Sequence, residues 1–243
     1  MTRVSRFRPD GRVVLRPQWR DLLFLHWDFP PDFVSPLLPP GLELDTFAGR
    51  AYVGLVPFTM SDVRPFWVPD LGRFDRFYSR FAELNVRSYV RRDGVPGVWF
   101  FSLDAASSLA ALTARAWFGL PYFKARMRSR ETPRGFSFWS KRLWPAPWNA
   151  TCSVRFQPHG QERAAASDSL EEFLLERYVL YSRRGGRLYR GRVFHDPYRF
   201  QNARVETLRE SCLRAAGFAR PDAAPHALFC RGVDVEAWGV EPC

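Results

Sequence analysis

One short segment carries three polar side chains in a pattern that could support acid–base chemistry. Residues 81–90 read FAELNVRSYV, which is typical of a β-strand. Because alternate residues of a strand share a face, Glu83, Asn85 and Arg87 lie together on one side. If that side faces a protein interior, its charges must be paired and hydrogen-bonded. The segment therefore predicts a polar interior site, with an ordinary solvent-facing strand as the alternative.

A second segment offers a nucleophile. In LPYFKARM, residues 120–127, strand alternation places Tyr122, Lys124 and Arg126 on one face. The chain has only one other lysine, Lys141. Inside a cavity and beside arginines, the pKa of Lys124 would fall, and its neutral amine could attack a carbonyl carbon. A surface lysine on a strand is the alternative interpretation.

Other reactive residue types form no recognisable motif. His26 and His195 are each isolated, and a lone histidine is more often a hydrogen-bonded structural residue than a ligand. The four cysteines show neither a CxxC pair nor zinc spacing, and there is no phosphate-binding glycine loop. We therefore expect reduced thiols, no metal site and no cofactor.

The net charge of +11 and the pI of about 10.1 raise the question of a polyanion partner. The 36 basic residues include 34 arginines, which are dispersed along the chain, so we interpret them as a solvated basic surface. Nucleic acid or an anionic membrane is the less favoured alternative. The sequence shows neither an apolar run long enough for a membrane span nor a secretory signal, so we expect a cytoplasmic protein.

The pattern of elements indicates one α+β domain. We expect a basic N-terminal arm over residues 1–18 and a single domain over 19–243. About ten short strands with two or three peripheral helices, at 105–117, after Ser169 and at 205–216, favour a curved antiparallel sheet that closes into a β-barrel. The long loop at 61–79 is a candidate lid.

Seven fragments in order resemble one family. They are HW (26–27), LLPPGLELDTFAGRAYVGLVPF (37–58), ELNVRSYV (83–90), GVWFFSLDA (97–105), LPYFKARM (120–127), LEEFLLERYVLYSRR (170–184) and HDPY (195–198). Together they resemble the uncharacterised YqjF-like family, which is similar to the acetoacetate decarboxylase-like superfamily. The resemblance implies a cone-like antiparallel barrel around a central cavity. Decarboxylases of this superfamily form oligomers, so it also leaves a homo-oligomer open.

The resemblance assigns site positions by register. It places the pocket arginine of the decarboxylases at Arg20, one pocket glutamate at Glu83 and a second near Tyr52. The Schiff-base lysine falls on Tyr122, so the nucleophile is missing from its position, and its activating neighbour falls on a phenylalanine. Lys124, two residues further along the strand, is the remaining candidate for an amine nucleophile.

We therefore expect a small-molecule cavity protein, with lyase-like chemistry on a small anionic or carbonyl compound. Glu83 would be the general acid or base, Tyr122 a donor to a developing oxyanion and Lys124 a nucleophile if Schiff-base chemistry survives. The expected substrate-binding residues are Arg20, Arg87, Asn85, Tyr52 and Trp27. A noncatalytic binder or sensor on the same scaffold is the alternative, and nucleic-acid binding through the basic surface is a third.

Overall fold

The computed structural model describes residues 7–63, 80–107, 119–146 and 149–243. Nearly all of the secondary structure is strand. The strands are β1 (Val13–Leu15), β2 (Gln18–Phe29), β3 (Glu43–Leu44), β4 (Ala51–Ser61), β5 (Phe81–Arg92), β6 (Val95–Ala105), β7 (Tyr122–Thr132), β8 (Gly135–Trp144), β9 (Thr151–Arg163), β10 (Val179–Arg184), β11 (Arg187–Phe194), β12 (Phe200–Glu210), β13 (His226–Asp234), β14 (Glu236–Trp238) and β15 (Glu241–Pro242). The helices are α1 (Pro31–Val34), the 3-10 helix η1 (Ser35–Leu37), α4 (Leu170–Leu175) and α5 (Cys212–Ala215).

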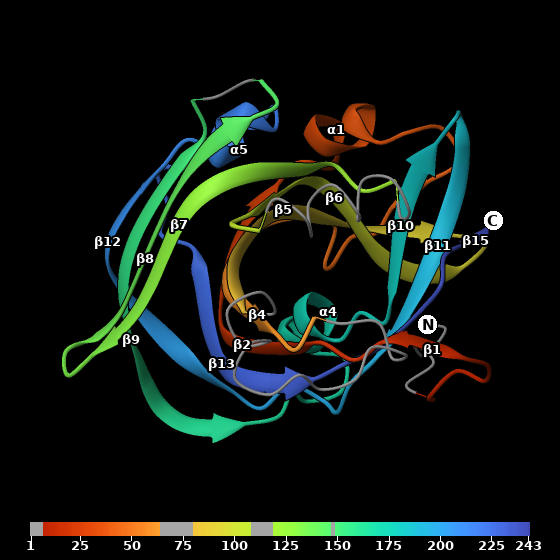
Figure 1. Cartoon of the computed structure of the whole chain (residues 1–243). Coiled ribbons are helices and arrows are strands. Elements are labelled where there is room, and N and C mark those ends of the chain that lie inside the picture. Colours follow the sequence, from red (N-terminus) through yellow and green to blue (C-terminus); the bar gives the residue numbers. More distant parts are fainter. Residues whose placement is uncertain (1–6, 64–79, 108–118, 147–148) are drawn as a thin grey trace.

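The strands follow one another around a ring (Figure 1). The order β6, β7, β8, β9, β12, β13, β2, β4, β5 returns to its start because β5 also pairs with β6. A branch through β10, β11, β14 and β1 leaves the ring at β6. The expectation of a purely antiparallel sheet is wrong at this point, because β6 runs parallel to both β7 and β10.

The central strands of the ring are covered on both faces. Leu23 and Leu25 of β2 lie in one apolar core, whereas Leu22 and Phe24 lie in another on the opposite face. The first core fills the space between β2, β4, β5, β8, β9 and β12, and the second lies under α4 and β11. Burial on both faces explains why β2 and β4 read as almost continuous apolar runs rather than as an alternation.

The helices are short and lie at the edges or across one face of the ring (Figure 1). The expected capping residue of α4 is confirmed: the Ser169 hydroxyl accepts a hydrogen bond from the Glu172 backbone at 3.2 Å. Leu174 and Leu175 of this helix are buried, so α4 is held by packing rather than by helix propensity. None of the helices in the described residues has the length and apolar character that crossing a bilayer requires.

Two expected elements differ in the structure. Residues 205–216, expected as a helix, instead continue strand β12, and only Cys212–Ala215 is helical. Pairing of Val205–Glu210 with β9 overrides the local helix propensity of this segment. Part of the expected N-terminal arm also joins the sheet, because Val13 to Leu15 pair with β14. The expected helix at 105–117 and the loop at 61–79 fall largely outside the described residues.

Candidate functional site

The polar side of β5 faces the interior, as predicted. We call its residues Glu83, Asn85, Arg87 and Tyr89 the polar face; all four are buried, with exposed fractions of 1%, 5%, 9% and 0%. The even-numbered side chains of the same strand, such as Leu84 and Val86, lie in the first apolar core. Burial of charged groups must be offset by specific partners.

At one end of the polar face, Glu83 meets Tyr122. The Tyr122 hydroxyl donates a hydrogen bond to the Glu83 carboxyl group at 3.2 Å, and both groups are buried among Phe81, Leu103 and neighbouring apolar side chains. Burial raises the pKa of Glu83 to about 8, although the hydrogen bond from Tyr122 lowers it in part. Burial and the nearby carboxyl group also raise the pKa of Tyr122 well above its usual value. Glu83 can therefore change protonation state near neutral pH, as a general acid or base must.

At the other end, Arg87 makes contacts with neutral groups. Its guanidinium donates to the Leu174 carbonyl at 3.0 Å and to the Tyr89 hydroxyl at 3.4 Å. The same hydroxyl lies 2.7 Å from His26 Nε2 and donates to the Leu174 carbonyl at 2.9 Å. Among the described residues, Arg87 forms no ion pair with a carboxylate, and its Nε atom has no hydrogen-bond partner. A buried guanidinium without a counter-charge favours an anion beside it.

The histidines near Arg87 stay neutral. Burial lowers the pKa of His26 well below its usual value and that of His195 to about 4, and the positive charge of Arg87 lowers both further. His195 packs against the rings of Trp19, Tyr178 and Tyr198 at centroid distances of 5.9, 4.8 and 4.5 Å. Arg87 thus supplies the positive charge at this end, within a wall of aromatic and neutral polar groups.

Several buried polar atoms on this side of the sheet have no hydrogen-bond partner among the described residues. They are Trp19 Nε1, His26 Nδ1, Asn85 Oδ1, Arg87 Nε and His195 Nε2. Buried polar groups are nearly always hydrogen-bonded in native proteins, so a cluster of such atoms is typical of a site for a polar small molecule.

Glycine makes room for this arrangement. Gly54 lies between His26 and Arg87 in the row of paired residues that crosses β2, β4 and β5. A Cβ atom at Gly54 would lie 2.8 Å from His26 Nε2 and 3.5 Å from Arg87 Cγ. The absence of a side chain therefore allows the imidazole and the arginine stem to pack over the strand.

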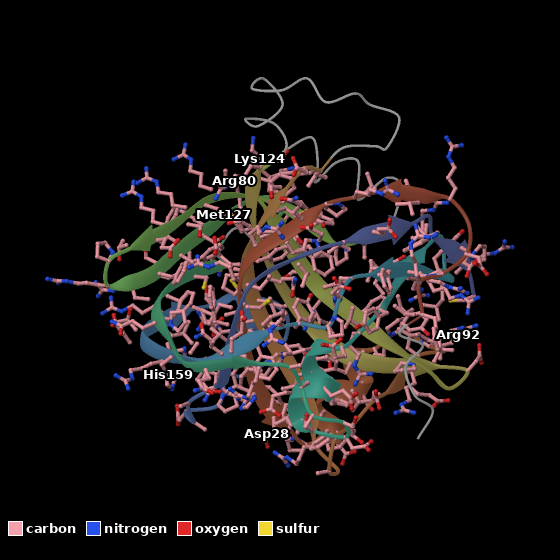
Figure 2. The ribbon with its side chains drawn as sticks, turned by 90° about the horizontal axis from the view of Figure 1, so that it is seen from below. Asp28, Arg80, Arg92, Lys124, Met127 and His159 are labelled. Atoms are coloured by element: carbon pink, nitrogen blue, oxygen red, sulfur yellow. The ribbon has the colours of Figure 1, made fainter. Side chains whose placement is uncertain are left out.

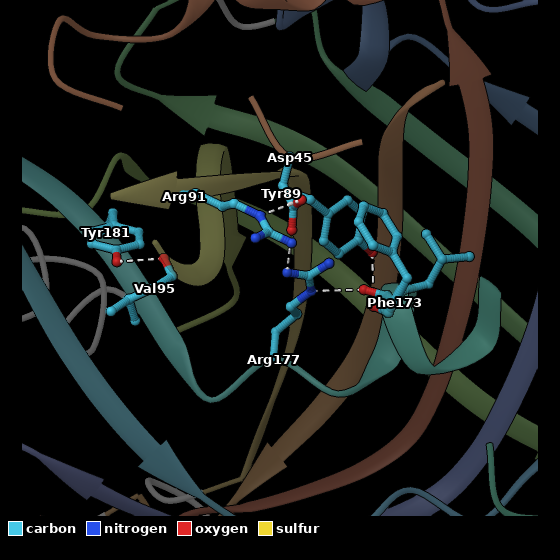
Figure 3. Close-up of polar contacts among 8 residues, drawn as sticks. Asp45, Tyr89, Arg91, Val95, Phe173, Arg177 and Tyr181 are labelled. Atoms are coloured by element: carbon cyan, nitrogen blue, oxygen red, sulfur yellow. Dashed lines mark hydrogen bonds and ion pairs between the residues drawn. The ribbon is translucent and has the colours of Figure 1, made fainter. Parts of the chain in front are cut away.

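A buried ionic cluster holds α4 against the polar face (Figure 3). The Asp45 carboxylate bridges Arg91 and Arg177, with one oxygen 2.7 Å from each guanidinium. Arg177 also donates to the Phe173 carbonyl at 2.7 Å, and its guanidinium lies over the rings of Phe173 and Tyr89. The cluster ties the end of α4 to β5 and so fixes the helix that supplies the Leu174 carbonyl to the polar face.

Lys124 does not join the site. It shares a strand face with Tyr122, as predicted, but only Tyr122 is covered by the apolar cluster around Phe81 and Leu103. Lys124 is exposed at the end of the molecule where Arg80 also lies (Figure 2). Lys141 is exposed as well. The expectation that an amine nucleophile enters the interior is therefore wrong in this structure, because on this face of β7 only Tyr122 is buried and the side chains from Lys124 onward are exposed.

Arg20 faces away from Glu83. In an antiparallel pair, opposite residues share a face; Arg20 pairs with Thr59, and Thr59 pairs with Ala82, the neighbour of Glu83. Its guanidinium donates to the Val233 carbonyl at 2.8 Å and pairs with Asp234. The strand bulges between Arg20 and Leu25, with Asp21 at a φ of 53°, and this bulge reverses the face on which Arg20 lies.

The other two predicted binding residues also lie apart from Glu83. Trp27 points into the first apolar core, and its Nε1 donates to the Ala223 carbonyl at 3.0 Å. Tyr52 pairs with Asp28, which lies at the opposite end of the molecule from Lys124 (Figure 2). The structure therefore unites Glu83, Tyr122, Asn85 and Arg87 of the predicted set on one side of the sheet. Tyr52 lies on the same side but at the other end, against Phe173 and the cluster around Tyr89. Arg20, Trp27 and Lys124 are separated from the polar face.

A second buried ion pair lies on the opposite face of the ring. Arg142 Nη2 is 2.8 Å from Asp104 Oδ1, and both side chains are almost fully buried. The Arg142 guanidinium stacks on Phe123 at 3.7 Å. Burial raises the pKa of Asp104 to about 6 despite its partner. This pair was not predicted, and because its two strands are far apart in sequence, no local pattern indicates it.

The expected site residues leave out some neighbours of Glu83 and Arg87. Strand alternation places Tyr89 on the same face as Glu83, although Tyr89 is not among the expected site residues. The pattern treats His26 as a structural residue, and its contact with Tyr89 fits that interpretation. His195 and Trp19 meet only through tertiary packing, which no local signal indicates. Among the described residues, no group of three or more His, Cys, Asp and Glu side chains is placed to hold a metal ion.

Comparisons with known proteins agree with this fold. Residues 16–234 match the DUF2071 family model, described as an uncharacterized conserved protein. The chain is 36% identical over 230 residues to the uncharacterized protein YqjF of Bacillus subtilis (strain 168), covering 95% of this chain and 93% of that protein. Among solved structures it is similar to the enduracididine biosynthesis enzyme MppR complexed with pyruvate, with 14% identity, a TM-score of 0.63 and coverage of 96% and 91% of the two chains. It is also similar to acetoacetate decarboxylase from Legionella pneumophila, with 12% identity, a TM-score of 0.64 and coverage of 97% and 91%.

Proposed function

Because the chain belongs to the DUF2071 family and shares its fold with acetoacetate decarboxylase and MppR, we propose that it is an enzyme that acts on small oxo acids. In this proposal the ring of strands is a barrel filled by the first apolar core, and the polar face lines a cavity on the other side of β5, beneath α4. Glu83 moves a proton at the carbon beside the substrate carbonyl, and Arg87 holds the substrate carboxylate.

The observation that carries the proposal is the buried pair of Glu83 and Tyr122. A carboxyl group with a pKa of about 8 is held partly as acid and partly as base near neutral pH. As a carboxylate, Glu83 takes the proton from the carbon next to the carbonyl, which leaves an enolate. Tyr122 donates a hydrogen bond to the charge that develops on the enolate oxygen, and Glu83, now protonated, returns the proton to carbon.

Arg87 supports an anionic substrate. Its guanidinium is buried, contacts neutral groups and retains an unpartnered Nε, so a carboxylate can accept charge-assisted hydrogen bonds from it. The solved MppR complex contains pyruvate, which is the smallest oxo acid that fits this chemistry. In an extended strand, Glu83 and Arg87 lie roughly 13 Å apart between Cα atoms, so oxo acids with a longer chain between the carboxylate and the carbonyl group belong in the test.

The chain's own residues argue against amine catalysis. Both lysines are exposed, and neither lies on the buried polar face. Tyr122 occupies the position that the resemblance assigns to the Schiff-base lysine, and a phenol cannot form an imine with a carbonyl compound. The proposed reaction is therefore proton transfer by Glu83 without a covalent intermediate.

The test is hydrogen–deuterium exchange at the carbon beside the carbonyl, followed by proton NMR in D2O. Pyruvate and oxo acids whose carbonyl group lies progressively further from the carboxylate are incubated with the protein and with Glu83→Gln and Tyr122→Phe. We expect the protein to accelerate exchange, Glu83→Gln to abolish the acceleration and Tyr122→Phe to reduce it by about 10²-fold or more. An active Glu83→Gln variant would refute the assignment of the base.

Two arginines provide a matched pair for the binding step. Arg87→Gln should lose carboxylate affinity by at least about tenfold in calorimetric titration, whereas Arg20→Gln should bind normally because Arg20 lies on the opposite face. Equal losses in both variants would contradict the placement of the carboxylate.

A noncatalytic binder is the second candidate, and the wall of Phe24, Tyr89, Tyr198 and His195 around Arg87 favours it. Such a site binds a small anion through one guanidinium and excludes water with aromatic rings. Saturable binding that depends on Arg87, without hydrogen exchange on any of the oxo acids, would favour this function over the enzyme.

A further inference from the structure

Seven cationic side chains gather on the outer face of β7, β8, β9 and β12. They are Lys124, Arg126, Arg128, Arg130, Lys141, Arg155 and Arg209, and all are exposed. Six of them, all except Lys141, line an open hollow of about 1190 Å³ together with Trp139. We call this surface the basic trough.

Strand register fixes the trough in place. Arg128 pairs with Trp139, Trp139 with Ser153, and Ser153 with Arg209, so one row crosses all four strands. The intervening residues of these strands, such as Phe138 and Val154, are buried in the first apolar core. Because the apolar side must face that core, the cations must face outward, and a shift of register would bury them.

The cations of the trough have no carboxylate partners. Among the described residues, none of the seven forms an ion pair, and one hydrogen bond, from Arg155 to Thr207 at 3.4 Å, is their only side-chain contact of this kind. Elsewhere on the surface some arginines are paired with carboxylates, as Arg231 is with Glu131 and Arg190 with Glu241. Glu131 and Glu206, at the margins of the trough, are engaged by Arg231 and Gln157. The trough is therefore an unneutralised positive surface.

Charge and aromatic exposure together identify the kind of partner. We propose that the basic trough binds single-stranded nucleic acid. Arg126, Arg128 and Arg130 are spaced at about 6.8 Å along an extended strand, an interval suited to successive phosphates of a single strand. Trp139, with 38% of its surface exposed, stands among them, and an exposed indole offers a face on which a base stacks.

A second copy of this chain does not fit the trough. Each copy carries a net charge of +11, so two copies repel each other unless an acidic patch is presented. The trough is also separate from the proposed enzyme site: its cations are exposed on β7, β8, β9 and β12, whereas Glu83 and Arg87 are buried on β5. Nucleic-acid binding and oxo-acid chemistry can therefore fail independently.

The test is fluorescence anisotropy with labelled oligonucleotides about 15 nucleotides long, single- and double-stranded, between about 50 and 200 mM salt. We expect tighter binding of the single strand and a linear fall of log affinity with log salt. The variant Arg126→Glu/Arg128→Glu removes two contacts, so its salt slope should be shallower by about 1.4 and its affinity lower by at least tenfold. Trp139→Ala should weaken binding about tenfold through lost stacking.

The control variant is Arg183→Glu/Arg187→Glu on the β10–β11 hairpin. It lowers the net charge by four units, as the trough variant does, and should retain affinity within a few-fold. Equal losses in both variants would show that net charge alone drives binding and would overturn the proposal. Absence of binding at low salt, preference for the duplex, or binding of anionic phospholipid vesicles without oligonucleotide binding would also overturn it. Unchanged melting temperatures show that the variants fold.

Discussion

The buried Glu83 carboxyl group should make the stability of this protein depend on pH in a characteristic way. Its pKa is about 8 in the folded protein against an ordinary value of 4.5, because burial disfavours the carboxylate. Between these two values the folded state holds a proton that the unfolded state has released. Its stabilising contribution is therefore complete below the lower pKa and is lost as pH rises through the upper one.

The size of the effect follows from the shift. Each unit of pH between the two pKa values lowers the free energy of unfolding by about 1.36 kcal/mol, so the loss from pH 5.5 to 7.5 is about 2.7 kcal/mol. Glu83→Gln cannot titrate but still offers an oxygen that accepts the hydrogen bond from Tyr122. The difference in unfolding free energy between the protein and this variant should therefore move by that amount in favour of the variant.

Urea denaturation followed by tryptophan fluorescence at a series of pH values measures this difference. The contributions of other titrating groups to the unfolding free energy cancel in this difference, because both proteins contain them. Asp104→Asn removes the other buried acid with a raised pKa and so tests whether Glu83 titrates independently of it. A difference that stays flat over this range would show that Glu83 titrates as an exposed carboxyl group does. The reasoning about its burial, and with it the acid–base proposal, would then be refuted.

Three further variants test neighbouring features. Tyr122→Phe removes the hydrogen bond that lowers the pKa of the buried carboxyl group, so the loss of stability should extend to higher pH in the same urea titrations. Asp45→Asn leaves the buried guanidinium of Arg177 without its carboxylate and should lower the free energy of unfolding by about 3–5 kcal/mol. An unchanged urea midpoint would show that the ionic cluster of Asp45, Arg91 and Arg177 does not hold α4 in place. Gly54→Ala places a methyl group against His26 and should cost about 1–3 kcal/mol, measured by the shift of the urea midpoint, and a neutral result would mean that the imidazole moves aside easily.

The polar face could be predicted from sequence because it depends on one local rule. Alternation in a strand without a bulge of its own fixes which of Glu83, Asn85 and Arg87 share a side. Whether the side is buried depends on what covers it. Here the cover comes from α4 and from residues beyond 170, whose position no pattern in residues 81–90 could indicate.

The expected faces of side chains are wrong, or their burial is misjudged, where tertiary structure interrupts or uncovers a strand. Arg20 would share the face of Leu22 under plain alternation, but the bulge at Asp21 reverses it. Lys124 keeps the face of Tyr122, yet it is exposed because the apolar cover ends there. The clustering of arginines in the trough also needs register between four strands, so a chain with dispersed arginines gave no sign of it.

The route by which the ring closes has a consequence for folding. His26 of β2 pairs with His226 of β13, so strands at nearly opposite ends of the chain lie side by side. During synthesis, about 200 further residues must follow β2 before its partner β13 leaves the ribosome. Contacts of such long sequence separation slow folding, and an unpaired apolar edge of β2 exposes the nascent chain to aggregation. We therefore expect the growing polypeptide to depend on chaperones until β13 emerges.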